Sequence, residues 1–177
     1  MLLKLKNVNI AFGEKRVINN LNLGIAKTDR ILLLGANGSG KTTLIKYICE
    51  AYKDKCKISY LRQKDMLLPY LTAFKNLELV GGSKRAEELI KKLKLEDYKK
   101  SYPYQLSGGV HRAFLVLRAL LFDYELLILD EPLANLDNAM ALAVLDLVKS
   151  ETEGRAVIIT SHRNIDELNF TNKTVLV

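Results

Sequence analysis

Hydrophobic positions recur along the chain with two periods, one typical of strands and the other of helices. Residues 2–12 (LLKLKNVNIAF) alternate between apolar and polar side chains, as a half-buried strand does, and the alternation slips in phase near Asn7. Residues 18–25 (INNLNLGI) predict a second strand. Five further short segments rich in apolar residues also predict strands, and they are 30–35, 57–61, 126–130, 156–160 and 173–177.

Helical periodicity lies between these strand segments. In residues 41–52 (KTTLIKYICEAY), one helical face collects the apolar side chains Leu44, Ile45 and Ile48. Other segments with this period predict helices that begin near Ser107 or cover residues 138–150 and 164–168. Because strands and helices alternate, the sequence predicts an α/β fold whose mostly parallel sheet is covered on both faces.

Residues 64–105 differ from the rest of the chain. They have helical periodicity, a break at the glycine pair 81–82, and a proline near each end, at Pro69 and Pro103. This pattern predicts a compact, mostly helical insert between the strands.

Length and composition fit one folded domain. The chain has 177 residues, of which 49% are hydrophobic and 27% charged, and it shows no internal repeat or flexible linker. We therefore expect a single domain over residues 1–177, with a helical subdomain at about 64–122. No apolar run is long enough to span a membrane or to form a signal peptide, so the expected location is the cytoplasm.

The net charge of +7 is compatible with an acidic partner such as a nucleotide, a nucleic acid or lipid headgroups. The basic residues are dispersed, however, and residues 84–100 (KRAEELIKKLKLEDYKK) predict one solvated amphipathic helix. Cys49 and Cys56 lie seven positions apart without metal-ligand partners at zinc spacing, which favours two thiols over a metal pair or a disulfide.

A glycine-rich segment, GANGSGKT, joins the strand at 30–35 to the helix at 41–52 and fits the pattern G-x-x-x-x-G-K-[ST]. Glycines let successive amides turn onto phosphate oxygens, and the helix start adds partial positive charge. Lys41 can reach the outer phosphates, and the Thr42 hydroxyl can ligate Mg²⁺. The predicted phosphate-binding residues are Gly35, Ala36, Asn37, Gly38, Ser39, Gly40, Lys41, Thr42 and Thr43.

Two carboxylates end the apolar strand LLILDE. Beside a phosphate site, Asp130 is suited to hold the Mg²⁺ shell and Glu131 to polarise or position an attacking water. An acidic turn after a strand would give the same local pattern. The upstream phosphate site favours the catalytic interpretation.

Gln63 and His162 also follow predicted strands. Gln63 could contact the metal or the water, and His162 could hydrogen-bond the terminal phosphate. Each residue alone is equally typical of a surface or capping position. The carboxyl ends of parallel strands meet in one crevice, however, which favours a shared site.

A second helix start of unusual composition occurs at residues 106–110 (LSGGV). Ser107 is a favourable N-cap, and Gly108 and Gly109 would let a phosphate approach the bare amides. A capped core helix would explain the serine but not the paired glycines, which weaken a helix start. The sequence therefore predicts two anion-binding helix starts.

Taken in order, GANGSGKT, Gln63, LSGGV, LLILDE, LANLD and the serine–histidine pair that ends at His162 resemble the nucleotide-binding subunit of an ATP-binding cassette (ABC) transporter. The resemblance spans nearly the whole chain. It implies a P-loop NTPase fold with a small antiparallel β subdomain at the N-terminus, and the cofactors ATP and Mg²⁺. Phe12 lies 23 residues before Gly35, where the family places an aromatic side chain that stacks on adenine.

The resemblance also implies a shared active site. Two subunits would form a head-to-tail dimer, with Ser107, Gly108 and Gly109 of one covering the ATP held by the other. The LANLD segment, which ends at Asp137, would run along the dimer interface. The implied catalytic residues are Glu131, His162 and Gln63, and the implied metal ligands are Thr42, Gln63 and Asp130.

A transport role requires membrane partners, because no membrane span is present in this sequence. The expected partners are a second ABC subunit, most simply an identical chain, transmembrane permease subunits and, in an importer, a solute-binding protein. The chain would then lie peripherally on the inner face of the membrane. Residues 64–80 resemble those of importers for nitrate, sulfonates, taurine or thiamine precursors, and they are either a docking surface or a plain buried helix and loop.

The chain departs from the family pattern at two positions. Val110 replaces the usual glutamine, and Arg112 is followed by Ala113 where a Gln-Arg pair is usual, so the expected arginine is shifted by one. The alternative function is a non-transport ABC ATPase acting on nucleic acid or ribosomes. Only about 43 residues separate Gln63 from Leu106, which leaves no room for long coiled coils, and we expect no nucleic-acid partner.

Overall fold

The computed structural model describes residues 1–13, 15–161 and 171–176. The chain forms two compact units. The first unit comprises Met1–Ile58, Tyr124–Asp130 and Gly154–Val177, and the second comprises Ser59–Asp123 and Glu131–Glu153. No helix of the described part is long and apolar enough to cross a membrane.

An antiparallel hairpin of β1 (Leu3–Phe12) and β2 (Lys15–Ile25) begins the first unit. The slip in alternation near Asn7 is a register shift in this hairpin, because Asn7 and Asn20 both adopt a φ of 49°. Asparagine tolerates this left-handed backbone better than most residues. The extra residue returns Val8 to the buried face that Leu5 occupies.

Side-chain amides replace ladder hydrogen bonds at these two irregular positions. The Asn7 N–H donates to Oδ1 of Asn22 at 3.0 Å, and the Asn20 N–H donates to Oδ1 of Asn9 at 2.8 Å. The side chains of Asn22 and Asn9 thus satisfy the two backbone donors that the bulges remove from the ladder.

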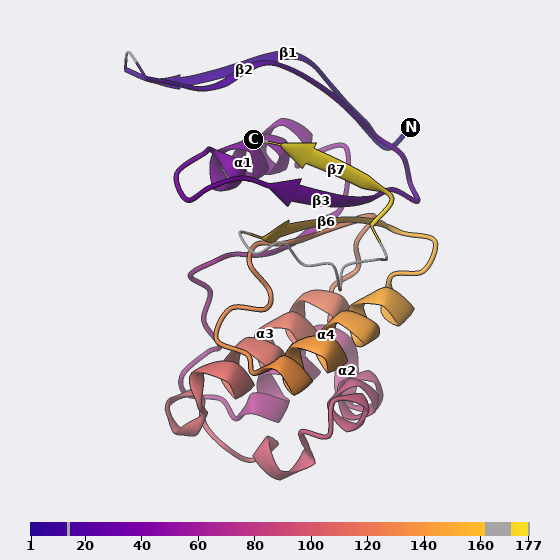
Figure 1. The fold of residues 1–177 in the computed structure, drawn as a ribbon. Helices are drawn as coiled ribbons and strands as arrows, with labels where there is room; N and C mark the ends of the chain where they lie inside the picture. Colours follow the sequence, from indigo (N-terminus) through magenta and orange to yellow (C-terminus); the bar gives the residue numbers. More distant parts are fainter. Residues whose placement is uncertain (14, 162–170, 177) are drawn as a thin grey trace. The chain divides into compact units, whose positions relative to one another are not determined.

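The main sheet contains β3 (Arg30–Leu34), β4 (Ile58–Leu61), β5 (Leu126–Leu129), β6 (Ala156–Ser161) and β7 (Lys173–Leu176). Its order is β4-β5-β6-β3-β7, and the pairs β3–β6, β3–β7 and β5–β6 are parallel. Figure 1 shows β3 between β6 and β7. Every residue of β5 and β6 is buried, as parallel strands with both faces covered require. The predicted α/β class with a mostly parallel sheet is confirmed.

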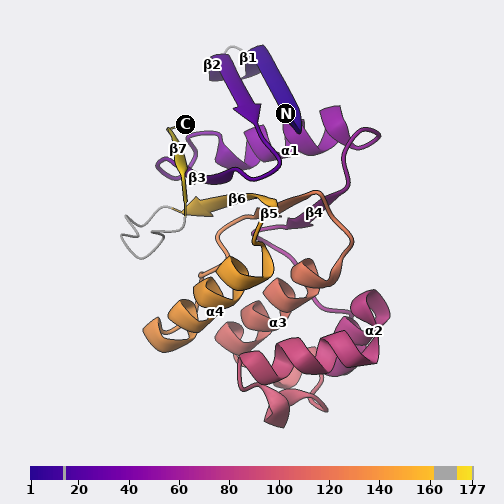
Figure 2. The same ribbon diagram turned by 90° about the vertical axis from the view of Figure 1, so that its right-hand side faces the viewer.

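Helix α1 (Lys41–Tyr52) lies between the hairpin and the sheet in both ribbon views (Figures 1 and 2). Leu44, Ile45 and Ile48 are fully buried, so the predicted apolar face is confirmed. The Tyr52 hydroxyl, at the end of the helix, donates to the carbonyl of Lys4 in β1. Cys49 and Cys56 are both thiols rather than a disulfide.

The second unit is helical and contains α2 (Ala73–Lys92), α3 (Gly108–Leu121) and α4 (Asn138–Glu151). Two 3₁₀ turns, at Glu96–Tyr98 and Pro103–Gln105, connect α2 to α3, and α4 follows β5 in the chain. Helix α3 contacts both of the others (Figure 2). The predicted break at residues 81–82 is a kink within α2, where Gly82 has a φ of 74°. A Cβ on Gly81 would lie 2.3 Å from a Leu121 side-chain carbon, so glycine permits close packing of α2 on α3.

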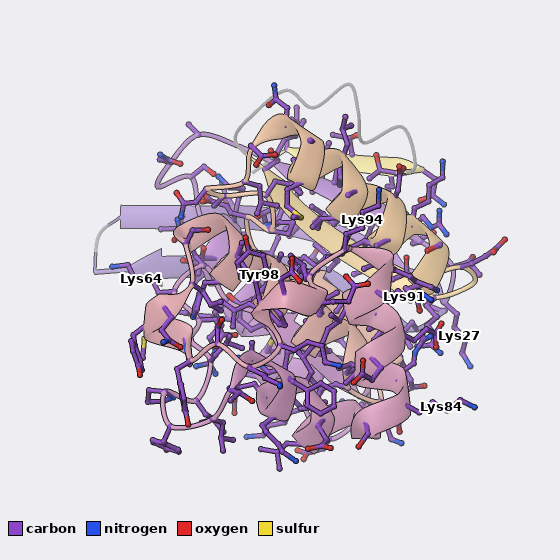
Figure 3. The ribbon with its side chains drawn as sticks, turned by 90° about the horizontal axis from the view of Figure 1, so that it is seen from below. Lys27, Lys64, Lys84, Lys91, Lys94 and Tyr98 are labelled. Atoms are coloured by element: carbon purple, nitrogen blue, oxygen red, sulfur yellow. The ribbon has the colours of Figure 1, made fainter. Side chains whose placement is uncertain are left out.

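The single helix predicted over 84–100 is wrong in its extent. Helix α2 ends at Lys92, and Lys94 takes a φ of 56° before the 3₁₀ turn. Leu93 and Leu95 are buried on either side, so tertiary packing interrupts a segment that is helical by composition. The exposed lysines Lys84 and Lys91 agree with the predicted solvated face (Figure 3). The helix predicted over 164–168 lies outside the described residues.

Candidate functional site

The glycine-rich loop between β3 and α1 needs glycine at two positions. Gly38 and Gly40 have φ values of 79° and 114°, which other residues rarely adopt. A Cβ on Gly40 would also lie 2.5 Å from a Val17 side-chain carbon. Gly40 is the N-cap of α1 and offers no side-chain cap, so the first amides of the helix are available to an anion.

Lys41 lies over this loop. Its side chain is 6% exposed, and its ammonium donates to the carbonyls of Gly35 at 2.6 Å and Ala36 at 3.0 Å. The loop backbone thereby fixes a largely buried positive charge at its own rim. Among the described residues, the hydrogen bonds of this buried cation go to neutral carbonyls, which favours the approach of a negatively charged ligand.

Asp130 links the loop helix to the sheet within the first unit. Its Oδ2 accepts from the Thr42 hydroxyl at 3.0 Å, and its Oδ1 accepts from the Thr160 hydroxyl at 2.6 Å. Asp130 is 1% exposed, and its hydrogen bond with Thr160 is buried while that with Thr42 is partly buried. The structure thus brings together Thr42 and Asp130, as predicted, and adds Thr160.

The Thr42 and Asp130 oxygens fit Mg²⁺, which prefers oxygen ligands and usually takes only one or two carboxylates beside substrate phosphates. No group of three or more histidine, cysteine, aspartate or glutamate side chains suited to a metal occurs within residues 1–13, 15–161 and 171–176.

Gln63 and Glu131 meet in the second unit. The Gln63 side-chain amide donates to Oε2 of Glu131 at 3.0 Å. Glu131 has a φ of 53°, a strained value for this residue type, so the surrounding contacts must fix its backbone. Its carboxylate follows Asp130 directly in the chain, yet the two carboxylates have different hydrogen-bond partners.

Arg112 also contacts this pair, and the sequence did not single it out as a site residue. It is 5% exposed, and its guanidinium donates to the carbonyls of Arg62 at 3.0 Å, Gln63 at 3.4 Å and Glu131 at 2.9 Å. The only signal in the sequence was an arginine placed one position away from the family pattern.

The LSGGV and LANLD segments meet at the start of α3. Ser107 is the N-cap, with its hydroxyl accepting from the Val110 N–H at 3.3 Å. Asp137 caps α4 through the Met140 N–H at 2.8 Å. One open hollow of about 510 Å³ is lined by Ser107, Gly108, Gly109, Val110, Asn135, Leu136, Asp137 and Met140.

The imidazole of His111 lies one turn into α3. Burial lowers its pKa below the ordinary value of 6.5, and the charges of Arg118 and Arg112 lower it further, against an opposing effect of Asp65. His111 is therefore neutral at pH 7, and the backbone amides, not an imidazolium, provide the positive charge at this helix start.

The two glycines of this helix start differ in the room they leave. A Cβ on Gly109 would lie 2.9 Å from the Asn135 carbonyl oxygen, whereas a Cβ on Gly108 meets nothing closer than 3.9 Å. Gly109→Ala is therefore expected to lower the free energy of unfolding by about 1–3 kcal/mol, because the Asn135 backbone must shift. Gly108→Ala should leave stability unchanged or raise it slightly.

Urea denaturation of the two variants beside the wild-type protein measures this difference. Equal midpoints for Gly108→Ala and Gly109→Ala would contradict the close approach of the two segments.

Two predicted site residues are not placed by the structure. Phe12 is the last residue of β1, but its side chain is not among those described. His162 lies outside the described residues. Their contacts with adenine and with the terminal phosphate stay predictions.

A family model described as ABC transporter matches residues 18–134. The aliphatic sulfonates import ATP-binding protein SsuB 2 of Pseudomonas syringae pv. syringae is 34% identical, with 98% of this chain and 68% of that protein covered. A Staphylococcus epidermidis protein named for hemin import, the ATP-binding protein HrtA, is 30% identical over 89% of this chain and 87% of its own length.

Solved structures agree with this similarity. The dimeric ATP-binding cassette MJ0796, in a post-hydrolysis state with ADP and Pi, is 27% identical with a TM-score of 0.84. The match covers 98% of this chain and 93% of that one. An ATP-binding subunit of an ABC transporter, at 21% identity and a TM-score of 0.85, shares the fold.

Proposed function

The chain belongs to the ABC transporter family, and from this premise we propose that it is the ATP-hydrolysing subunit of an importer, working as a dimer on separate membrane subunits. Its activity is ATP hydrolysis, as in the family. One observation carries the proposal furthest. Consecutive carboxylates have separate partners, since Asp130 accepts from Thr42 while Glu131 accepts from Gln63.

In this proposal the glycine-rich loop and Lys41 bind the phosphates. The bare amides at the start of α1 and the Lys41 ammonium would hold the outer phosphates of ATP. Thr42 and Asp130 would hold Mg²⁺, which when bound neutralises charge on the phosphates. Thr160 fixes the carboxylate of Asp130, so that its other oxygen lone pairs keep one orientation.

In this proposal Glu131 activates the attacking water. A carboxylate in this position can accept a proton from water as the water attacks the terminal phosphate. The Gln63 amide donates to the Glu131 carboxylate. In this proposal Gln63 would also contact the metal or relay movement of its own loop. His162 would contact the terminal phosphate, and Phe12 would stack on adenine.

A second copy of the chain completes the site in this proposal. Ser107, Gly108 and Gly109 line a hollow at the start of α3, where the first amides of a helix have no intrahelical partner and can meet an anion. The similar cassette MJ0796 was solved as a dimer with ADP and Pi, which supports the same assembly here. Each nucleotide would then lie between the loop of one copy and the α3 start of the other.

Residues 64–80 are the proposed docking surface for permease subunits. Met66, Tyr70 and Leu79 are 72%, 74% and 68% exposed, although Leu67 and Leu77 are buried. The segment therefore combines a buried anchor with an exposed apolar face that a membrane partner could cover. The transported substrate would be selected by those subunits and, in an importer, by a solute-binding protein.

Purification of the tagged chain from detergent-solubilised membranes tests the transport role. We expect hydrophobic permease subunits to co-purify with the wild-type chain. A variant carrying Met66→Ser and Tyr70→Ser should lose them while retaining ATP hydrolysis, because neither side chain belongs to the proposed ATP site. Co-purification of RNA or ribosomal proteins in place of permeases would contradict transport and support the alternative function.

A further inference from the structure

We propose that Arg112 is a positioning residue that couples the start of α3 to the water-activating pair Gln63 and Glu131. The inference rests on the proposed role of Glu131. The Arg112 guanidinium donates to backbone carbonyls of two segments far apart in sequence, at residues 62–63 and at Glu131.

The geometry of the guanidinium suits this bridging. One terminal nitrogen donates to Arg62 and Gln63, and the other donates to Glu131, so the planar fork sets the spacing of the two segments. Arginine keeps its charge and its fixed donor directions at every physiological pH. A lysine ammonium in the same place could not hold both segments with one rigid group.

The strained backbone of Glu131 gives this bridge a function. A φ of 53° persists for glutamate only where neighbouring contacts hold it, and Arg112 holds the carbonyl of that same residue. Because Gln63 is held at its carbonyl as well, Arg112 orients both members of the hydrogen-bonded pair.

The position of Arg112 on α3 links this pair to the helix start. Arg112 lies one helical turn beyond Gly108, on the same rigid element whose first residues line the hollow. A ligand that moves the start of α3 therefore moves the carbonyls that orient Glu131.

Two substitutions test the inference, Arg112→Met and Arg112→Lys. We expect Arg112→Met to lower kcat for ATP hydrolysis about 10- to 100-fold, within the range for loss of a positioned base, with KM and ATP affinity unchanged. Arg112→Lys should recover only part of the loss, because it keeps the charge but not the fork. If Arg112→Met does not fold, as judged by circular dichroism, Arg112→Lys measures the same effect.

Arg118→Met is the matched control. Arg118 is on the same helix and donates to the carbonyl of Met66 at 2.9 Å and to Oδ1 of Asp65 at 3.0 Å, but it contacts neither Gln63 nor Glu131 in the hydrogen bonds described. The Arg118→Met variant should lose the hydrogen bonds to Met66 and Asp65, but its kcat should not fall as that of Arg112→Met does. Equal falls in kcat for Arg112→Met and Arg118→Met would reject a specific role for Arg112.

A double-mutant cycle with Glu131→Gln identifies the route of the effect. If Arg112 acts through Glu131, adding Arg112→Met to Glu131→Gln should slow hydrolysis no further. Multiplication of the two losses would overturn the inference and leave the proposed function standing. A wild-type rate in Glu131→Gln alone would reject the role of Glu131 and the inference with it.

Discussion

Replacing Lys41 by alanine is expected to weaken ATP binding about 100-fold or more and to abolish hydrolysis at micromolar ATP, from the loss of about 3 kcal/mol in charged hydrogen bonds. Lys41 is the buried cation of the phosphate loop, and its ammonium is held by carbonyls at the loop rim. No neighbouring side chain of the loop carries a charge that could replace it.

Titration calorimetry with ATP and Mg²⁺ measures the affinity. Lys46→Ala is the matched control, since Lys46 is an exposed lysine of the same helix and should bind ATP as the wild-type protein does. Micromolar affinity retained in Lys41→Ala would contradict the assignment of the loop to the phosphates.

Glu131→Gln is expected to retain ATP binding and to slow hydrolysis by about 10²–10⁴-fold, the range for loss of a general base. The substitution removes the proton acceptor but preserves the shape of the side chain. The new amide oxygen can still accept from Gln63, so the local geometry should persist. The phosphate loop is untouched, and nucleotide affinity should therefore be normal.

Phosphate release under saturating ATP measures the effect, with single-turnover rates to separate chemistry from product release. Glu153→Gln, which removes an exposed carboxylate elsewhere in the same unit, should hydrolyse ATP at the wild-type rate. An unchanged rate in Glu131→Gln would remove Glu131 from its proposed role.

Local patterns predicted much of the fold and part of the site. Apolar periodicity located α1 and its buried face, since Leu44, Ile45 and Ile48 recur at helical spacing. The glycine spacing located the loop, because Gly38 and Gly40 need a backbone that other residues rarely adopt. Polar residues that follow apolar strands, such as Gln63 and Asp130, were visible in the same way.

Contacts between segments far apart in sequence were not predictable in this way. Thr160 looks like one polar position in an apolar strand until β6 pairs with β5, where Leu129 lies opposite Ile159 and the Thr160 hydroxyl meets Asp130. Arg112 donates to the backbone carbonyls of Arg62, Gln63 and Glu131, and a pattern of side chains does not predict such contacts. The helix end at Lys92 likewise depends on burial of Leu93 and Leu95, which local helix propensity does not register.

Sedimentation velocity of Glu131→Gln with Mg²⁺ and ATP is the most direct measurement of the central claim, that two chains together enclose each nucleotide. The account predicts a dimer with ATP, a monomer with ADP, and a much weaker dimer when Gly108→Ala is added, because a methyl group then lies at the amides that meet the partner's phosphate. A protein that stays monomeric with ATP at high concentration, while lone wild-type chains hydrolyse at full rate, would contradict it.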